Sequence, residues 1–215
     1  MKSVRVWYTK TGRLKYISHL DMNRVMSRIV RRARLPVWCT EGFNPHPHIT
    51  FALPLSLGFE SDYEAMDIRL TDDGMPLDYV RECFAAAAPD GMSVLSVSEP
   101  VSKFKDIRFA RFLISFECDC SADIERLMAS GAIPVEKSTK KGGTRPVDIY
   151  PLISAHSCAE GQRGTVLDIT LSAGNDDNVN PMLFVGAVEK DCGRDLPIGS
   201  VRRTMLYDKD MNEFV

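Results

Sequence analysis

The fold is decided by a stretch near the N-terminus, SHLDMNRVMSRIVRRARLP, residues 18–36. Apolar residues recur in it at helical spacing, which predicts an amphipathic helix from Leu20 to about Arg34. Pro36 ends this helix, because proline lacks a backbone N–H and restricts the residue before it. The segments on either side must therefore supply whatever surface the apolar face of the helix covers.

Those segments alternate between apolar and polar residues, as strands do. The predicted elements of this half, in chain order, are a strand, the helix above, two strands, a helix and a strand, at Val4–Tyr8, Leu20–Arg34, Ile49–Leu53, Tyr63–Leu70, Pro76–Ala88 and Met92–Val97. The order β-α-β-β-α-β is that of a ferredoxin-like unit.

The same order recurs, with weaker patterns, after a predicted linker at Glu99–Lys103. Its elements are expected at Arg111–Glu117, Ala122–Ser130, Val147–Tyr150, Val166–Leu171, Pro181–Asp191 and Val201–Tyr207. A chain of 215 residues suits two units of about 100 residues each. The sequence therefore predicts an α+β protein of two tandem ferredoxin-like units, residues 1–100 and 101–215.

Charge is distributed unevenly along the chain. Residues 1–40 contain ten Lys or Arg and one acid, Asp21, which gives a net charge of +9. Because the whole chain has a formal charge of −2, the remaining residues carry −11. Polyanions are the usual partners of such a basic surface. An acidic patch on this chain or on a partner protein is the alternative anion.

The rest of the composition excludes several classes of protein. No run of 18 apolar residues occurs, and the first five residues lack the apolar core of a signal peptide, so a cytoplasmic protein with no membrane partner is expected. The six cysteines are scattered, without a CxxC pair, and are expected to be free thiols. The CxxxCxxC pattern that holds an iron–sulfur cluster in radical-SAM enzymes is also missing, so no cofactor is expected.

Four arginines of the predicted helix share one face. At 100° per residue, Arg24, Arg28, Arg31 and Arg32 fall within about 100°, opposite the apolar side chains. Their like charges repel at three- and four-residue spacing, and the acids that usually lie between them are absent. Guanidinium groups match the geometry of phosphate oxygens. We expect an anion to bind this face, and a merely solvated helix is the alternative.

The helix is expected to begin with a capping box. Ser18 is the predicted N-cap, and Asp21 follows three residues later. His19 lies between them in the first helical turn, near the basic turn formed by Lys10, Arg13 and Lys15. A histidine at this place is expected to contact a phosphate or transfer a proton, or else to be a surface residue without a role.

A second group of polar residues follows the helix, in the sequence GFNPHPH at residues 42–48. Its two prolines restrict the backbone, so Asn44, His46 and His48 are expected to form a fixed array. A metal site needs further ligands at recognisable spacing, and none is present, so no metal is expected. Glu64 and Asp67 have opposite strand parity and form no acid/base pair, and we expect them to orient the arginines or a histidine.

Several motifs occupy the N-terminal half: KxGxxKYISHLD at residues 10–21, RRAxLP at 31–36, GFNPHP at 42–47 and LPLxLG at 53–58. Together with residues 60–67 and 140–151, they closely resemble the radical-SAM-linked domain family. The resemblance implies a domain found alone or joined to a radical-SAM protein, often encoded near RNA-processing genes of the ribonuclease type. In architecture alone, two ferredoxin-like units with a basic helix and loop histidines are similar to CRISPR repeat-processing endoribonucleases.

Three functions are consistent with these residues. The first is a non-catalytic RNA-binding or substrate-presenting accessory protein of a radical-SAM enzyme, in RNA modification or processing. The second is a metal-independent endoribonuclease with His19 or His46 as the catalytic base. The third is a protein-docking module without nucleic acid. RNA target, partner enzyme and oligomeric state stay open. The residues expected to bind RNA are Lys10, Arg13, Lys15, His19, Arg24, Arg28, Arg31, Arg32, Asn44, His46 and His48.

Overall fold

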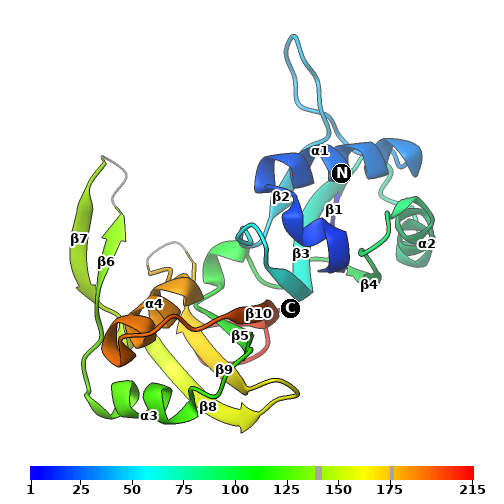
Figure 1. Cartoon of the computed structure of the whole chain (residues 1–215). Coiled ribbons are helices and arrows are strands. Elements are labelled where there is room, and N and C mark those ends of the chain that lie inside the picture. Colours follow the sequence, from blue (N-terminus) through cyan, green and yellow to red (C-terminus); the bar gives the residue numbers. More distant parts are fainter. Residues whose placement is uncertain (139–141, 175–176) are drawn as a thin grey trace. The chain divides into compact units, whose positions relative to one another are not determined.

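Two compact units make up the chain in this computed structural model, which describes residues 1–138, 142–174 and 177–215 (Figure 1). Unit 1 contains Met1–Asp106 and the last two residues, Phe214–Val215, and unit 2 contains Ile107–Glu213. The described residues form both α-helices and antiparallel strands, which confirms the predicted α+β class.

Unit 1 has its helices and strands in the predicted order. Its elements are β1 (Lys2–Lys10), the 3-10 helix η1 (Gly12–Tyr16), α1 (His19–Arg32), β2 (Ile49–Phe51), β3 (Glu60–Leu70), α2 (Leu77–Ala87), β4 (Val94–Ser98) and the 3-10 helix η2 (Phe104–Asp106). The strands pair antiparallel in the order β4-β1-β3-β2. All six predicted helices and strands of this half exist, with ends that differ by at most three residues.

Both helices of unit 1 cover the same face of its sheet. Val6 of β1 and Ile68 of β3 are 1% exposed, and they belong to one hydrophobic cluster with Met26 and Ile29 of α1 and Phe84 of α2. Burial of side chains of this size contributes about 1.5–3 kcal/mol each. Because α1 buries this stripe, its opposite face must point toward solvent.

The other face of the unit 1 sheet holds a buried cation. Arg5 of β1 is fully buried, and its Nε donates to Asp67 Oδ1 of β3 at 2.8 Å. Its Cζ lies 4.2 Å from the centre of the Phe104 ring and 5.1 Å from that of Phe214. Tyr63 Oη donates to the Phe214 carbonyl at 3.0 Å. Asp67 thus orients the buried Arg5, whereas the sequence predicts an arginine of α1 or a histidine as its partner, and Phe214 ties the end of the chain to unit 1.

Unit 2 has a second antiparallel sheet. Its elements are β5 (Phe109–Phe116), α3 (Ser121–Ala129), β6 (Pro134–Ser138), β7 (Thr144–Asp148), the 3-10 helix η3 (Tyr150–Leu152), β8 (Ile153–Glu160), β9 (Thr165–Ser172), α4 (Pro181–Cys192) and β10 (Ile198–Tyr207). Four strands pair in the order β10-β5-β9-β8, and β6 and β7 form a separate hairpin that projects from them (Figure 1).

The strand predicted at Val147–Tyr150 is wrong. Val147 and Asp148 end β7 in the hairpin, and Tyr150 begins η3, whereas the strand next to β9 is β8. β8 is an edge strand whose eight side chains are all exposed or half-buried, so its sequence carries no buried stripe to reveal it. Residues 140 and 141, at the start of the later family-like motif, lie outside the described residues.

The six cysteines are free thiols, as their scattered spacing predicts. Burial raises the pKa of the Cys120 and Cys158 thiols to about 11. Both are therefore protonated at neutral pH and suit packing better than nucleophilic chemistry. No helix in the described part of the chain is long and apolar enough to cross a membrane.

Candidate functional site

The N-terminus of α1 has the predicted capping box. Ser18 Oγ accepts a hydrogen bond from the Asp21 backbone N–H at 3.1 Å and donates one to Asp21 Oδ2 at 2.8 Å. Arg24 Nη1 donates to the same carboxylate at 2.9 Å. Hydrogen bonds from Ser18 and then Arg24 hold the pKa of Asp21 below its ordinary value. The cap starts the helix at His19 and so fixes which side chains face outward.

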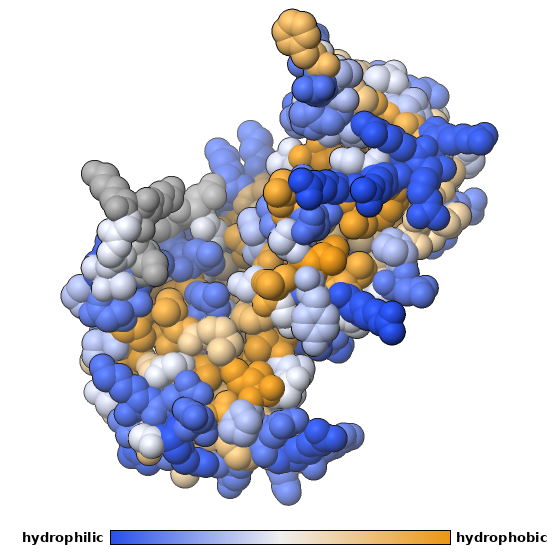
Figure 2. All heavy atoms as spheres, turned by 45° about the horizontal axis from the view of Figure 1, so that its top comes forward, coloured by the Kyte–Doolittle hydropathy of each residue, from blue (hydrophilic) through white to orange (hydrophobic). Residues whose placement is uncertain are grey.

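The predicted arginine face is exposed. Arg24, Arg28, Arg31 and Arg32 all project from the side of α1 opposite its buried residues, and Figure 2 shows hydrophilic side chains gathered over this part of unit 1. Arg24 is paired with Asp21, but the other three guanidinium groups make no hydrogen bond or ion pair with any residue that the structure describes. We call these four residues the arginine face. The repulsion among the four guanidinium groups is therefore only partly compensated, by Asp21.

The segment between α1 and β2 folds back on itself as a hairpin-like loop, residues 38–48, which we call the 38–48 loop. The His48 backbone N–H donates to the Trp38 carbonyl at 3.0 Å, and the Thr40 N–H donates to the His46 carbonyl at 2.9 Å. Figure 1 shows this loop projecting above α1. Backbone pairing, as well as the two prolines, thus sets its shape.

The two histidines of the loop have different supports. His46 Nδ1 lies 3.0 Å from Thr40 Oγ1 and 3.1 Å from the Asn44 carbonyl, so its ring is held from one side. The His48 ring packs against Trp38, with centroids 5.3 Å apart. Asn44 is exposed near the tip of the loop. Of the predicted array, the two histidines are held by contacts within the loop, and Asn44 takes part through its backbone carbonyl.

A groove of about 600 Å³ lies between α1 and the 38–48 loop. Arg24, Arg28 and Arg31 line it from the helix, and His46 and His48 line it from the loop. None of the described residues that line the groove is acidic. The remaining lining residues, which sequence reasoning missed, are Leu20, Asn23, Ser27, Pro47 and Ile49. Five predicted site residues from two distant segments are thus brought together.

His19 and Arg32 lie outside the lining of this groove. The His19 ring packs edge-on against Phe51, with centroids 5.1 Å apart, and its Nε2 is 3.3 Å from Asn23 Nδ2. Since Asn23 does line the groove, His19 lies next to the groove rather than in it. The two candidate catalytic histidines, His19 and His46, therefore have separate surroundings.

The basic residues of the turn before α1 are less accessible to a ligand than their sequence suggests. Lys10 is only 3% exposed, and its Nζ lies 3.4 Å from the Ile17 carbonyl, so a phosphate cannot reach it and its predicted role is withdrawn. Lys15 Nζ lies 3.9 Å from Glu60 Oε1. Arg13 is exposed on η1. β1 is buried on both faces, since residues 4–8 are all buried, so the alternation of its sequence does not reveal that Lys10 is buried.

The family model described as "Uncharacterized protein conserved in bacteria (DUF2344)" matches residues 3–181. The chain belongs to this DUF2344 family. The matched region includes α1, the 38–48 loop and the whole lining of the groove. No curated protein sequence matches the chain.

Two solved structures are similar to this DUF2344 chain at low identity. A chain in a crystal structure of a Cbf5-Nop10-Gar1 complex is 12% identical over 94% of this chain and 48% of that chain, with a TM-score of 0.49. This chain thus spans about half the length of that protein. An unknown protein from Galdieria sulphuraria is 13% identical over 92% of this chain and 96% of that chain, with a TM-score of 0.28.

The groove offers cations, imidazoles and amide or hydroxyl groups. Among the described residues of the DUF2344 chain, no three His, Cys, Asp or Glu side chains are grouped so as to hold a metal ion. The arrangement suits the binding of an anion by charge-assisted hydrogen bonds, for which guanidinium groups are the preferred donors.

Proposed function

We propose that the groove between α1 and the 38–48 loop binds the phosphate backbone of RNA, and that the protein is a cytoplasmic RNA-binding or substrate-presenting accessory of a radical-SAM enzyme. One observation carries the proposal: Arg28 and Arg31, which have no acidic partner in the described part of the chain, face His46 and His48 across a groove whose described lining lacks acids.

The spacing along α1 supports a chain-like anion. Arg24, Arg28 and Arg31 follow one another at four and three residues, so they are spread over about 10 Å of the helix axis at a rise of about 1.5 Å per residue. A single small anion cannot span that length, whereas successive phosphates of one strand can. Leu20, which is 63% exposed, adds apolar surface on which a ribose or a base can pack.

The sequence motifs support the enzyme partner. Residues 10–21, 31–36 and 42–47 carry the resemblance to the radical-SAM-linked domain family, and they build η1, α1 and the 38–48 loop. Co-purification of a radical-SAM protein with this chain is the expected result. If the pair survives nuclease treatment, the contact is between proteins; if it is lost, RNA bridges the two.

The test of RNA binding is a filter-binding titration over a salt series. Arg28→Ala/Arg31→Ala is compared with Arg81→Ala, which removes an exposed arginine of α2 on the same unit. Loss of two phosphate contacts is expected to reduce the slope of log K against log salt by about 1.4 for a single strand. Affinity that is absent at low salt, or that ignores both salt and the double substitution, would contradict the proposal.

A second candidate function, a metal-independent endoribonuclease, is favoured by the position of His46 in the groove beside the arginines. If Nδ1 donates to the Asn44 carbonyl, Nε2 is the nitrogen left to act as a base. Labelled RNA incubated with the protein in a chelator decides the matter. The accessory role predicts intact RNA; cleavage that His46→Ala abolishes would establish the nuclease instead.

We also propose that both units are ferredoxin-like. The strand orders β4-β1-β3-β2 and β10-β5-β9-β8 support this. In each unit, the last strand of the sheet lies at one edge and pairs with the first strand, which lies inside the sheet. In unit 2, the β6–β7 hairpin would then be an insertion between the first helix and the second strand of the sheet.

A further inference from the structure

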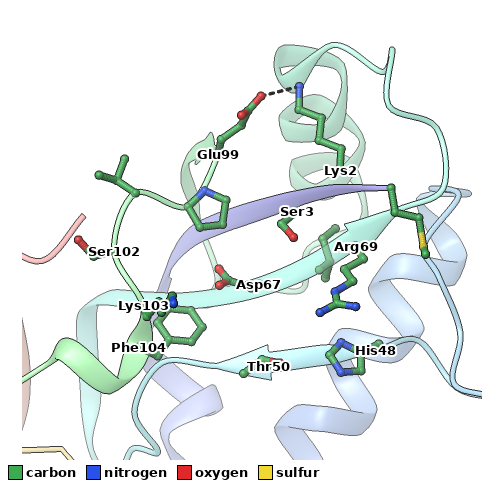
Figure 3. Close-up of a pocket in the computed structure, with 14 residues that line it drawn as sticks. Lys2, Ser3, His48, Thr50, Asp67, Arg69, Glu99, Ser102, Lys103 and Phe104 are labelled. Atoms are coloured by element: carbon green, nitrogen blue, oxygen red, sulfur yellow. Dashed lines mark ion pairs between the residues drawn. The ribbon is translucent and has the colours of Figure 1, made fainter.

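A second hollow, of about 770 Å³, lies on the face of the unit 1 sheet opposite α1. Asp67, Ile68 and Arg69 of β3 line it, but the Ile68 side chain is 1% exposed and belongs, like Leu70, to the cluster with the helices, so the polar side chains of the lining come from the other parity. Residues 99–104 form one wall (Figure 3). The proposed function does not use this hollow.

The acids of this hollow already have cationic partners. Lys2 Nζ lies 3.0 Å from Glu99 Oε1, and Asp67 is paired with the buried Arg5 at 2.8 Å. Both acids of the lining are thereby neutralised. The hollow keeps a surplus of positive charge because two further cations line it.

Those cations are Arg69 and Lys103. Neither side chain makes an ion pair or a hydrogen bond with a residue that the structure describes. The Arg69 guanidinium carbon lies 6.0 Å from the centre of the Trp38 ring, which supports it from one side. Figure 3 shows Arg69 and His48 close together at one side of the hollow, with Lys103 and Phe104 at another. The hollow therefore presents free cations next to aromatic surface.

His48 belongs to both hollows. It lines the groove beside α1 and also the hollow on the opposite face of the sheet. It stands directly before β2, which is three residues long and pairs with β3 alone among the described strands of unit 1. The Trp38 ring lies next to both His48 and Arg69: its centre is 5.3 Å from that of the His48 ring and 6.0 Å from the Arg69 guanidinium carbon. A row of side chains thus joins the two hollows around the edge of the sheet.

We infer that the RNA strand bound by the arginine face continues around this edge, past His48, into the hollow at Arg69 and Lys103, and that the ligand is therefore single-stranded. This inference rests on the proposed function. A path between the two faces of one sheet must reverse within about 10 Å, roughly the thickness of a packed layer. A duplex cannot follow it, since DNA duplexes have a persistence length of about 50 nm. An unpaired strand can, and its bases can stack on the His48 ring.

Fluorescence anisotropy with labelled oligouridines of about 4 and about 12 nucleotides tests this path, because the short strand fills one site and the long strand fills both. Arg69→Ala/Lys103→Ala is compared with Arg81→Ala/Lys190→Ala, which removes the same two residue types at exposed positions elsewhere. We expect the first pair to weaken binding of the long strand roughly tenfold and to lower its salt slope by about 1.4, with the short strand unaffected. Circular dichroism melting verifies that the variants fold.

The outcomes separate this inference from the proposed function. If Arg28→Ala/Arg31→Ala weakens both strands but Arg69→Ala/Lys103→Ala behaves like the control pair, the groove binds RNA and the path around the edge is wrong. Binding of a 12-base-pair duplex as tightly as the long single strand also overturns the path. If the unchanged protein binds neither strand at low salt, the proposed function itself fails.

Discussion

The arginines of α1 differ in their partners from two surface arginines of unit 2, Arg126 and Arg194. In unit 2, Arg126 of α3 lies 2.9 Å from Asp191 of α4 and 3.0 Å from Asp123, and Arg194 lies 2.6 Å from Asp123. The pair Arg126–Asp191 ties α3 to α4, and the pair Arg194–Asp123 ties the segment after α4 to α3. On α1, three of four arginines have no such partner among the described residues. The same residue type thus supports the fold in unit 2 and is left available to a ligand in unit 1.

Arg5 of unit 1 differs from both groups of arginines because it is buried. Its side chain is completely buried, and it donates to Asp67 and to the Ser102 carbonyl. Its Nη1 has no hydrogen-bond partner in the described part of the chain. Burial makes this cation dependent on the one carboxylate it has, because an unpaired buried charge is far costlier than an unpaired exposed one.

Asp67→Ala is therefore expected to have the largest effect on stability. Removing the carboxylate leaves the Arg5 guanidinium buried with a single carbonyl partner, at a cost of about 3 kcal/mol in the free energy of unfolding. Urea denaturation measures it. Asp90→Ala, which removes an exposed carboxylate of unit 1, is the control and should change stability by less than about 0.5 kcal/mol. Equal losses in both variants would mean that Arg5 does not depend on its partner.

Two sets of substitutions should change different properties. Arg28→Ala/Arg31→Ala should weaken RNA binding without loss of stability, and Arg126→Ala should lower stability without weakening RNA binding. The α1 pair should lower RNA affinity roughly tenfold at about 0.1 M salt and leave the free energy of unfolding within about 0.5 kcal/mol, because only repulsive contacts are lost. Arg126→Ala should lower the urea midpoint and leave RNA affinity unchanged. Filter binding and urea denaturation of both variants provide the test. The contrast between the two units is wrong if Arg126→Ala weakens RNA binding as much as the α1 pair does.

Much of unit 1 follows from its sequence because its periodic patterns coincide with its burial. The apolar stripe of α1 packs on the sheet, so the arginine face had to be exposed, and the cap at Ser18 fixed where the helix starts. β8 has no such stripe and was placed wrongly. Its neighbour β9, with a buried face, was found at nearly its true position.

The groove itself could not be predicted from sequence patterns. Residues 24–31 and 46–48 come together through backbone pairing of Trp38 with His48 and of Thr40 with His46, and no local pattern encodes that pairing. Charge counting also misplaced Lys10, since a basic turn says nothing about which way each strand residue points. Strand parity does not correct it, because β1 is buried on both faces, whereas in β3 parity does put Arg69 on the face away from α1.

A smaller loss of stability is expected from removing the N-cap of α1, the helix that carries the arginine face. Ser18→Ala removes the acceptor of the Asp21 N–H and should lower the free energy of unfolding by about 1 kcal/mol. Ser18→Thr keeps a hydroxyl at the N-cap and should recover most of the loss. Circular dichroism melting of the three proteins compares them. A Ser18→Thr variant as unstable as Ser18→Ala would show that the hydroxyl is not what stabilises the start of α1.

The smallest expected effect concerns the paired arginines of unit 2 at low pH. Hydrogen bonds from Arg194 and then Arg126 hold the pKa of Asp123 below its ordinary value of 3.8. A carboxyl whose pKa is lower in the folded state adds stability above its unfolded pKa, and this contribution disappears as the pH falls through the folded pKa. Between pH 5 and pH 2, the wild type should thus lose more stability than Asp123→Asn, which has no proton to gain there. The difference should be modest because the Arg126 side chain is 54% exposed and solvent screens the pair. Urea midpoints at both pH values measure it, and parallel losses in the two proteins would mean that the arginines of unit 2 are no more engaged than those of α1.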